Sequence, residues 1–130
     1  MTATSIVSYA VLIIYAVVIL FFSTAGIPEG MPEVWQIDKA YHFGAYAIMG
    51  WLTAMALRRP ILEKPFSMPG GKVVGLSFAV TFLFGAVIEV FQHYIPGRNA
   101  EMLDAVANGA GGLVGALIYV KLRRRKGVLR

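Results

Sequence analysis

Residues 6–22, IVSYAVLIIYAVVILFF, decide the fold, because they form an apolar run without a single charged side chain. An α-helix needs about 17–25 predominantly apolar residues to cross the hydrocarbon core of a bilayer. The run is followed by residues 26–30, GIPEG, which favour a turn. Residues 23–25, STA, resemble a signal-peptidase site, but no Lys or Arg precedes the run, so we expect a retained membrane helix.

Three further apolar runs of similar length follow along the chain. They end at RRP (residues 58–60), PG (residues 96–97) and RRRK (residues 123–126), which cannot continue into lipid or into a helix. The sequence therefore predicts an all-α, four-helix transmembrane bundle formed by a single domain. The domain is expected to cover residues 1–130, with spans at about residues 6–22, 40–57, 73–95 and 102–122.

The composition agrees with a membrane protein and leaves no room for a separate soluble domain. Hydrophobic residues make up 58% of the 130 residues and charged residues only 15%, against about 25% charged residues in soluble domains. The chain has no cysteine, which excludes disulfides and thiolate metal ligands. The net charge of +5 reflects basic segments at the span ends, so we expect no nucleic-acid partner.

Basic residues are distributed unequally between the two sides of the predicted bundle. Of the 12 Lys and Arg residues, only Lys39 and Arg98 fall outside the loop between the second and third spans and the end of the chain. Because positively charged loops stay in the cytoplasm, both termini are predicted to be cytoplasmic. The segments around residues 26–37 and 96–101 are then expected to face outward, in a multi-pass protein whose surroundings are the lipid bilayer.

Polar residues concentrate at the outward ends of three predicted helices. Ionisable groups at the centre of a membrane helix cost roughly 2.5–3.5 kcal/mol each, so they usually pair with one another and mark function. Residues three or four apart share a helical face, which gives each helix one polar stripe. The residues concerned are Asp38, Lys39, His42 and Tyr46, then Glu89, Gln92 and His93, then Asp104 and Asn108, with Arg98 in the outward loop.

Small residues on the fourth helix suggest how these stripes meet. Gly111 and Gly115 form a small-xxx-small pattern, which allows two helix backbones to approach closely. They lie near the helical face that carries Asp104 and Asn108, so close packing is expected to bring the polar stripes together. The sequence leaves open whether this packing occurs within one chain or in a homo-oligomer.

The order and spacing of the polar residues resemble the VanZ-like family of bacterial membrane proteins. The resemblance covers about residues 38–117 and is carried by Asp38-Lys39-x-x-His42-Phe43-x-x-Tyr46, Glu89-x-x-Gln92, Pro96-x-Arg98 and Asp104-x-x-x-Asn108-x-x-Gly111. The family is associated with low-level resistance to teicoplanin, a glycopeptide antibiotic that binds cell-wall precursors outside the membrane. The resemblance therefore implies an envelope role in the bacterial cytoplasmic membrane, without supplying a reaction.

The polar cluster is interpreted as a site that binds or modifies a lipid-linked cell-wall precursor or another anionic envelope component. In a hydrolase or transferase, Glu89 or His42 would serve as general base, and Asp38 or Asp104 would orient the histidine. Residues expected to bind the anionic substrate are Lys39, Arg98, Asp38, Gln92, Asn108 and Tyr46. The sequence does not decide whether the protein is an enzyme.

Two other interpretations stay open. In one, the protein is a non-enzymatic scaffold and the polar cluster is an ion-pair network that holds the helices together. In the other, it is a metal-dependent hydrolase or transferase, with ligands from His42, Glu89, His93 and Asp104. The two histidines lack a paired motif such as HExxH, so the sequence itself predicts neither a metal nor another cofactor.

Overall fold

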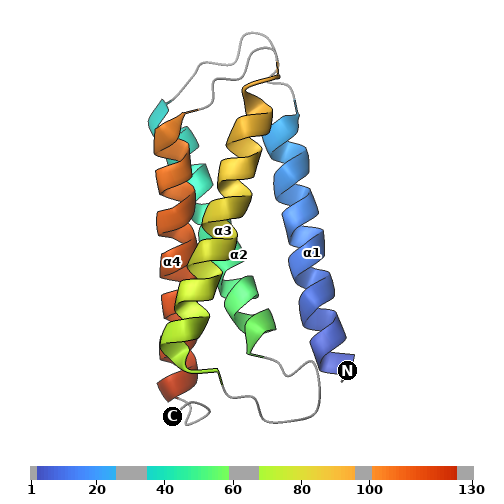
Figure 1. Ribbon diagram of the computed structural model, residues 1–130, viewed down its shortest axis with the longest axis vertical. Helices are drawn as coiled ribbons and strands as arrows, with labels where there is room; N and C mark the ends of the chain where they lie inside the picture. Colours follow the sequence, from blue (N-terminus) through green and yellow to red (C-terminus); the bar gives the residue numbers. More distant parts are fainter. Residues whose placement is uncertain (1–2, 26–34, 59–67, 96–100, 126–130) are drawn as a thin grey trace.

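The computed structural model describes residues 3–25, 35–58, 68–95 and 101–125. Within these ranges it contains four α-helices and no strand. The helices are α1 (Ala3–Thr24), α2 (Trp35–Leu57), α3 (Gly70–Gln92) and α4 (Met102–Arg125). They alternate in direction, so that α1 begins and α4 ends at the same end of the bundle (Figure 1). The predicted all-α four-helix bundle is confirmed.

The helix bounds differ from the predicted spans at the polar end of the bundle. α2 begins at Trp35 rather than near residue 40, so its polar first turns are also helical. α3 ends at Gln92 rather than at residue 95, and the next residues form turns in which the Ile95 N–H donates to the Gln92 carbonyl over 3.0 Å. Pro96 explains the early end, because the residue before a proline is disfavoured in a helix.

Three of the helices, α1, α3 and α4, are long and apolar enough to cross a membrane. The side chains of α1 fit such surroundings, since Ile13, Phe21 and Phe22 are 62–69% exposed. α2 is not among the three, although it is 23 residues long. It packs against all three other helices, most extensively against α4. The span expected at residues 40–57 stays a prediction.

The contact between α2 and α4 is a backbone-to-backbone seam built on glycine. A Cβ atom placed on Gly115 would overlap the Ala47 carbonyl oxygen and lie 2.7 Å from the carbonyl carbon. A Cβ on Gly111 would overlap the Phe43 carbonyl oxygen, and one on Gly50 would lie 2.7 Å from the Gly112 Cα. The small-xxx-small pattern therefore serves packing within one chain, as such patterns do in membrane helices.

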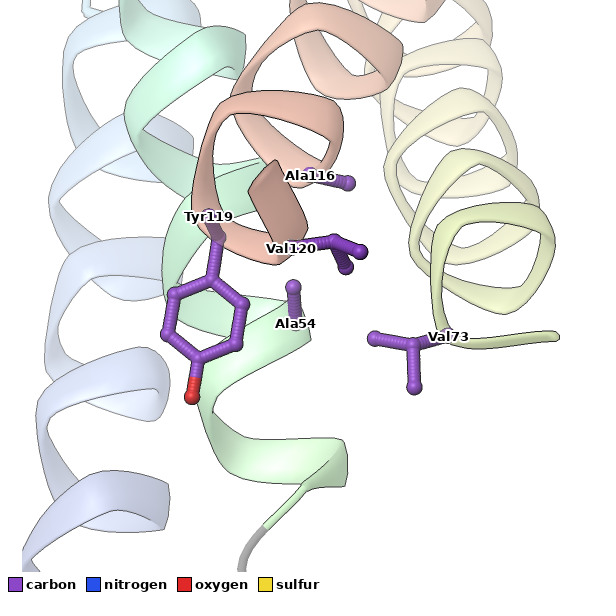
Figure 2. Packing of buried hydrophobic residues seen from close by; sticks show 5 residues of the cluster. All are labelled: Ala54, Val73, Ala116, Tyr119 and Val120. Carbon is purple, nitrogen blue, oxygen red and sulfur yellow. The ribbon is translucent and has the colours of Figure 1, made fainter. Parts of the chain in front are cut away.

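An apolar cluster fastens α2, α3 and α4 at the end of the bundle opposite the polar residues. Its buried members are Ala54, Val73, Ala116, Tyr119 and Val120, and Figure 2 shows these side chains converging from the three helices. Trp51 covers it, with its ring edge to face against Tyr119 at a centroid distance of 5.4 Å. With one end fixed in this way, the register of the three helices at the other end is also set.

Candidate functional site

Polar side chains from three helices meet at one end of the bundle. At this end α3 ends and α2 and α4 begin (Figure 1). Four of them are buried, with exposed fractions of 8% or less: Glu89, Gln92, Asp104 and Asn108. Lys39 and His42 of α2 are partly exposed. The polar stripes of the three helices therefore converge, as predicted.

Lys39 joins α2 to the beginning of α4 through two ion pairs. Its Nζ donates to Glu101 Oε2 over 2.6 Å and also contacts the Asp104 carboxylate. The Asp104 side chain is only 5% exposed and that of Glu101 is 39% exposed. The Asp104 pair is therefore the better shielded of the two, and water and salt screen it less.

His42 and Asn108 form the second connection between α2 and α4. His42 Nδ1 lies 2.9 Å from Asn108 Oδ1, and the Asn108 side chain is fully buried. In the tautomer with the proton on Nδ1, the ring donates to this oxygen and Nε2 keeps its lone pair. Gly85 of α3 makes room for the amide, because a Cβ there would lie 2.8 Å from Asn108 Nδ2.

Glu89 of α3 is the carboxylate with an unused oxygen. Its Oε2 accepts a hydrogen bond from the Glu101 backbone N–H over 3.3 Å. Its Oε1 is buried and has no hydrogen-bond partner among the described residues, and the same holds for the Tyr46 hydroxyl. Buried polar groups are nearly always satisfied, so an orphaned carboxylate oxygen calls for a ligand, a proton or water.

Three of these side chains approach one another closely enough to share a ligand. One potential metal-ligand atom each from His42, Glu89 and Asp104 lies within 4.8 Å of the others. Each residue comes from a different helix, so the group exists only in the assembled bundle. His93, the fourth residue of the metal set considered from sequence, is exposed and stacks edge to face on Tyr94, away from this group.

The charge of the described cluster is negative. Glu89, Glu101 and Asp104 bring three carboxylates, whereas Lys39 brings one ammonium, which leaves −2 when His42 is neutral and all three acids are ionised. Lys39, predicted to bind an anion, forms ion pairs with two of these carboxylates, which neutralise its charge. The described residues therefore attract cations more readily than anions.

The other residues predicted for the site make separate contacts or lie outside the described residues. Gln92 donates from Nε2 to the Ser23 carbonyl over 2.8 Å and thereby ties α3 to α1. Tyr46 is 1% exposed and packs against Phe84, with ring centroids 6.4 Å apart. Asp38 lies in the first turns of α2, but its side chain is outside the described part of the chain, as is the whole of Arg98.

Glu101 is the site residue that sequence reasoning missed. It belongs to the segment 96–101 that is expected to face outward, and it contacts Lys39 through its carboxylate and Glu89 through its backbone N–H. Its carbonyl also accepts the Asp104 N–H over 2.9 Å, at the first turn of α4. The spacing of three residues between Glu101 and Asp104 was the available signal, because acids favour the beginning of a helix.

These features define a class of protein: a helical bundle with membrane-compatible helices and a buried polar site at one end. The VanZ/LLP1 family model matches residues 6–124, so the chain belongs to this family and is a VanZ-like membrane protein. The resemblance noted from the polar motifs is confirmed, and it extends over nearly the whole chain. No curated protein and no solved structure showed significant similarity to the chain.

Proposed function

We propose that this protein acts in the bacterial cell envelope by binding an anionic or lipid-linked cell-wall component at its buried polar site. The observation that carries the proposal is the convergence of Lys39, His42, Glu89, Asp104 and Asn108 at one end of an otherwise apolar bundle. Membership of the VanZ/LLP1 family supports the envelope context, through the family's association with teicoplanin resistance. Resistance to this glycopeptide is the phenotype we expect first.

The orientation we propose is a multi-pass arrangement in the cytoplasmic membrane, with both termini in the cytoplasm. It is supported by the positions of basic residues, because the beginning of α3, which contains Lys72, and the basic end of α4 lie at the opposite end of the bundle from the polar site (Figure 1). The polar site then faces outward, where lipid-linked precursors are exposed. Reporters fused after Met31, Pro65 and Lys126 test this orientation, and an outward signal at Pro65 contradicts it.

Arg98 is the residue that we propose binds the anionic group. Lys39 is neutralised by Asp104 and Glu101, and Arg98 is the remaining basic residue that the sequence assigns to this end. A guanidinium suits this task, since it binds phosphate or carboxylate through two parallel hydrogen bonds. Arg98→Lys keeps the charge but removes this geometry, so it should weaken binding without removing the positive charge.

The functional experiment compares Glu89→Gln and Arg98→Lys with the wild type in a bacterial host. Teicoplanin susceptibility and membrane abundance are measured together, and His93→Gln provides a control at the same end of the bundle. We expect both site variants to lose the phenotype at normal abundance, while the control keeps it. Unchanged susceptibility in both site variants contradicts the proposal, as does an equal loss in His93→Gln.

A second candidate function is a non-enzymatic scaffold, which the dense pairing within the site favours. Lys39 with Asp104 and His42 with Asn108 already connect α2 to α4 without any ligand. A scaffold requires the network only for folding, so every site variant should lose phenotype and membrane abundance in parallel. Recovery of lipid-linked precursors with the purified wild type, but not with abundant Arg98→Lys protein, argues against the scaffold.

A further inference from the structure

We propose that His42, Glu89 and Asp104 form a binding site for one divalent transition-metal cation of the Zn²⁺ or Mn²⁺ type. The inference stands on the described side chains and does not depend on the envelope function proposed above. It rests on three observations: the proximity of one nitrogen and two oxygen ligands, the orphaned oxygen of Glu89, and the negative charge of the cluster.

The ligand set suits a borderline cation rather than Mg²⁺ or Ca²⁺. Imidazole nitrogen favours Zn²⁺, Fe²⁺ or Cu²⁺, and carboxylate oxygen also suits Mn²⁺. A cation with metal–ligand bonds of about 2.0–2.2 Å holds its ligand atoms roughly 3–4 Å apart. The potential ligand atoms of His42, Glu89 and Asp104 already lie within 4.8 Å of one another. Side-chain rotations that move these atoms by about 1 Å are therefore enough to close the site.

Two of the proposed ligands, His42 and Glu89, are positioned by a neighbouring group, as ligands in metal sites usually are. Asn108 accepts from His42 Nδ1, which leaves Nε2 with the lone pair that a metal needs. The Glu101 N–H holds Glu89 Oε2, while Oε1, on a side chain that is 8% exposed, has no partner in the described residues. The groups around the site therefore orient two ligands from two different helices.

Lys39 acts in this proposal as a positive charge that competes with the metal. Its ammonium contacts Asp104, so a cation at the site must share that carboxylate or displace the lysine. Lys39→Met removes the competing charge while keeping an unbranched side chain of similar length. We expect this variant to bind Zn²⁺ at least as tightly as the wild type and to gain more thermal stability from it. Weaker binding contradicts the competition.

Three protein ligands leave at least one coordination position open, as in catalytic zinc sites. A water molecule or an oxygen of a phosphate or carboxylate would fit this position chemically. The site would thus allow a negatively charged cluster to bind an anionic ligand, through the metal.

The first test uses the wild-type full-length protein in detergent, stripped with a chelator and titrated with Zn²⁺. Diethylpyrocarbonate modifies accessible histidines, and this chain has only two, His42 and His93. Mass spectrometry then follows the modification of each. We expect Zn²⁺ to protect His42 while His93, which is exposed, reacts as before. Equal protection of both histidines, or protection of neither, overturns the proposal.

The second test measures Zn²⁺ affinity and stoichiometry by calorimetry in variants checked for folding by circular dichroism. Glu89→Gln and Asp104→Asn replace a charged ligand with an amide of the same shape, and His93→Gln is the matched control. We expect the wild type to bind one equivalent of Zn²⁺ and the ligand variants to bind it with an affinity roughly 10–100-fold lower or more. Wild-type affinity in folded ligand variants overturns the proposal, as does an equal loss in His93→Gln.

Discussion

Gly115→Ala tests the seam between α2 and α4, where a single methyl group has no space. The added Cβ would overlap the Ala47 carbonyl oxygen and lie 3.0 Å from the Trp51 backbone nitrogen. An ordinary van der Waals separation is 3.4–4 Å, and backbone atoms cannot rotate away as side chains can. The two helices must therefore separate by roughly 1.5 Å, the kind of overpacking that costs about 1–3 kcal/mol.

The opposing term is the helix propensity of alanine, which favours the variant by at most about 1 kcal/mol. Because the clash is with backbone, we expect the upper part of the overpacking range and a net loss of about 1–2 kcal/mol. Gly75→Ala is the control, since a Cβ there meets nothing within 4 Å. It should leave stability unchanged or raise it slightly.

Unfolding of the purified protein in detergent, followed by circular dichroism against denaturant, measures both variants. Opening the seam should also separate His42 from Asn108, so the Zn²⁺ affinity of Gly115→Ala should fall with its stability. Equal stability of Gly115→Ala and wild type would refute the backbone clash. An equal loss in Gly75→Ala would show that the effect belongs to any glycine of the bundle and not to the seam.

Three further predictions concern single side chains and are measured by the same unfolding assay. Gln92→Met removes the hydrogen bond to the Ser23 carbonyl and should cost about 1 kcal/mol, and a loss near zero would contradict a role in holding α1. Tyr46→Phe should be neutral or stabilising, because the hydroxyl has no partner among the described residues, and a loss above about 1 kcal/mol would reveal a missing partner. Asp104→Asn should lower the free energy of unfolding by at most about 3–5 kcal/mol, because Asp104 is the buried partner of Lys39. Glu101→Gln should lower it by only about 0–1 kcal/mol, because Glu101 is more exposed, and equal losses would contradict this difference.

Much of the fold followed from the sequence because two strong signals agree. Long apolar runs predicted the helices, and the Gly111 and Gly115 pattern predicted the close packing of α4. The helix ends were predicted less accurately, since α3 ends at Gln92 and the residues expected to form its last turn form hydrogen-bonded turns instead. Hydropathy counts apolar residues and does not detect where a proline downstream ends the hydrogen-bond ladder.

The candidate site was predicted as a set of stripes, but not as a set of contacts. Helical spacing identified Glu89, Asp104 and Asn108 on the right faces, whereas it gave no information on the partner of each. His93 illustrates the limit, because spacing places it on the same face as Glu89, whereas it lies one residue beyond the end of α3 and is exposed. Which stripes touch depends on helix rotation, and that is set by the packing of distant residues.

The glycine seam and the polar site are two parts of one helix face and depend on each other. On α4, Asp104, Asn108, Gly111 and Gly115 repeat at intervals of three or four residues, so they share the surface that faces α2. Gly111 and Gly115 bring the backbones together, which carries Asn108 to His42 and Asp104 to Lys39. Close packing also buries Asn108 and Asp104, and electrostatic interactions strengthen as the local dielectric falls. The small residues therefore determine the strength of the polar site as well as its geometry.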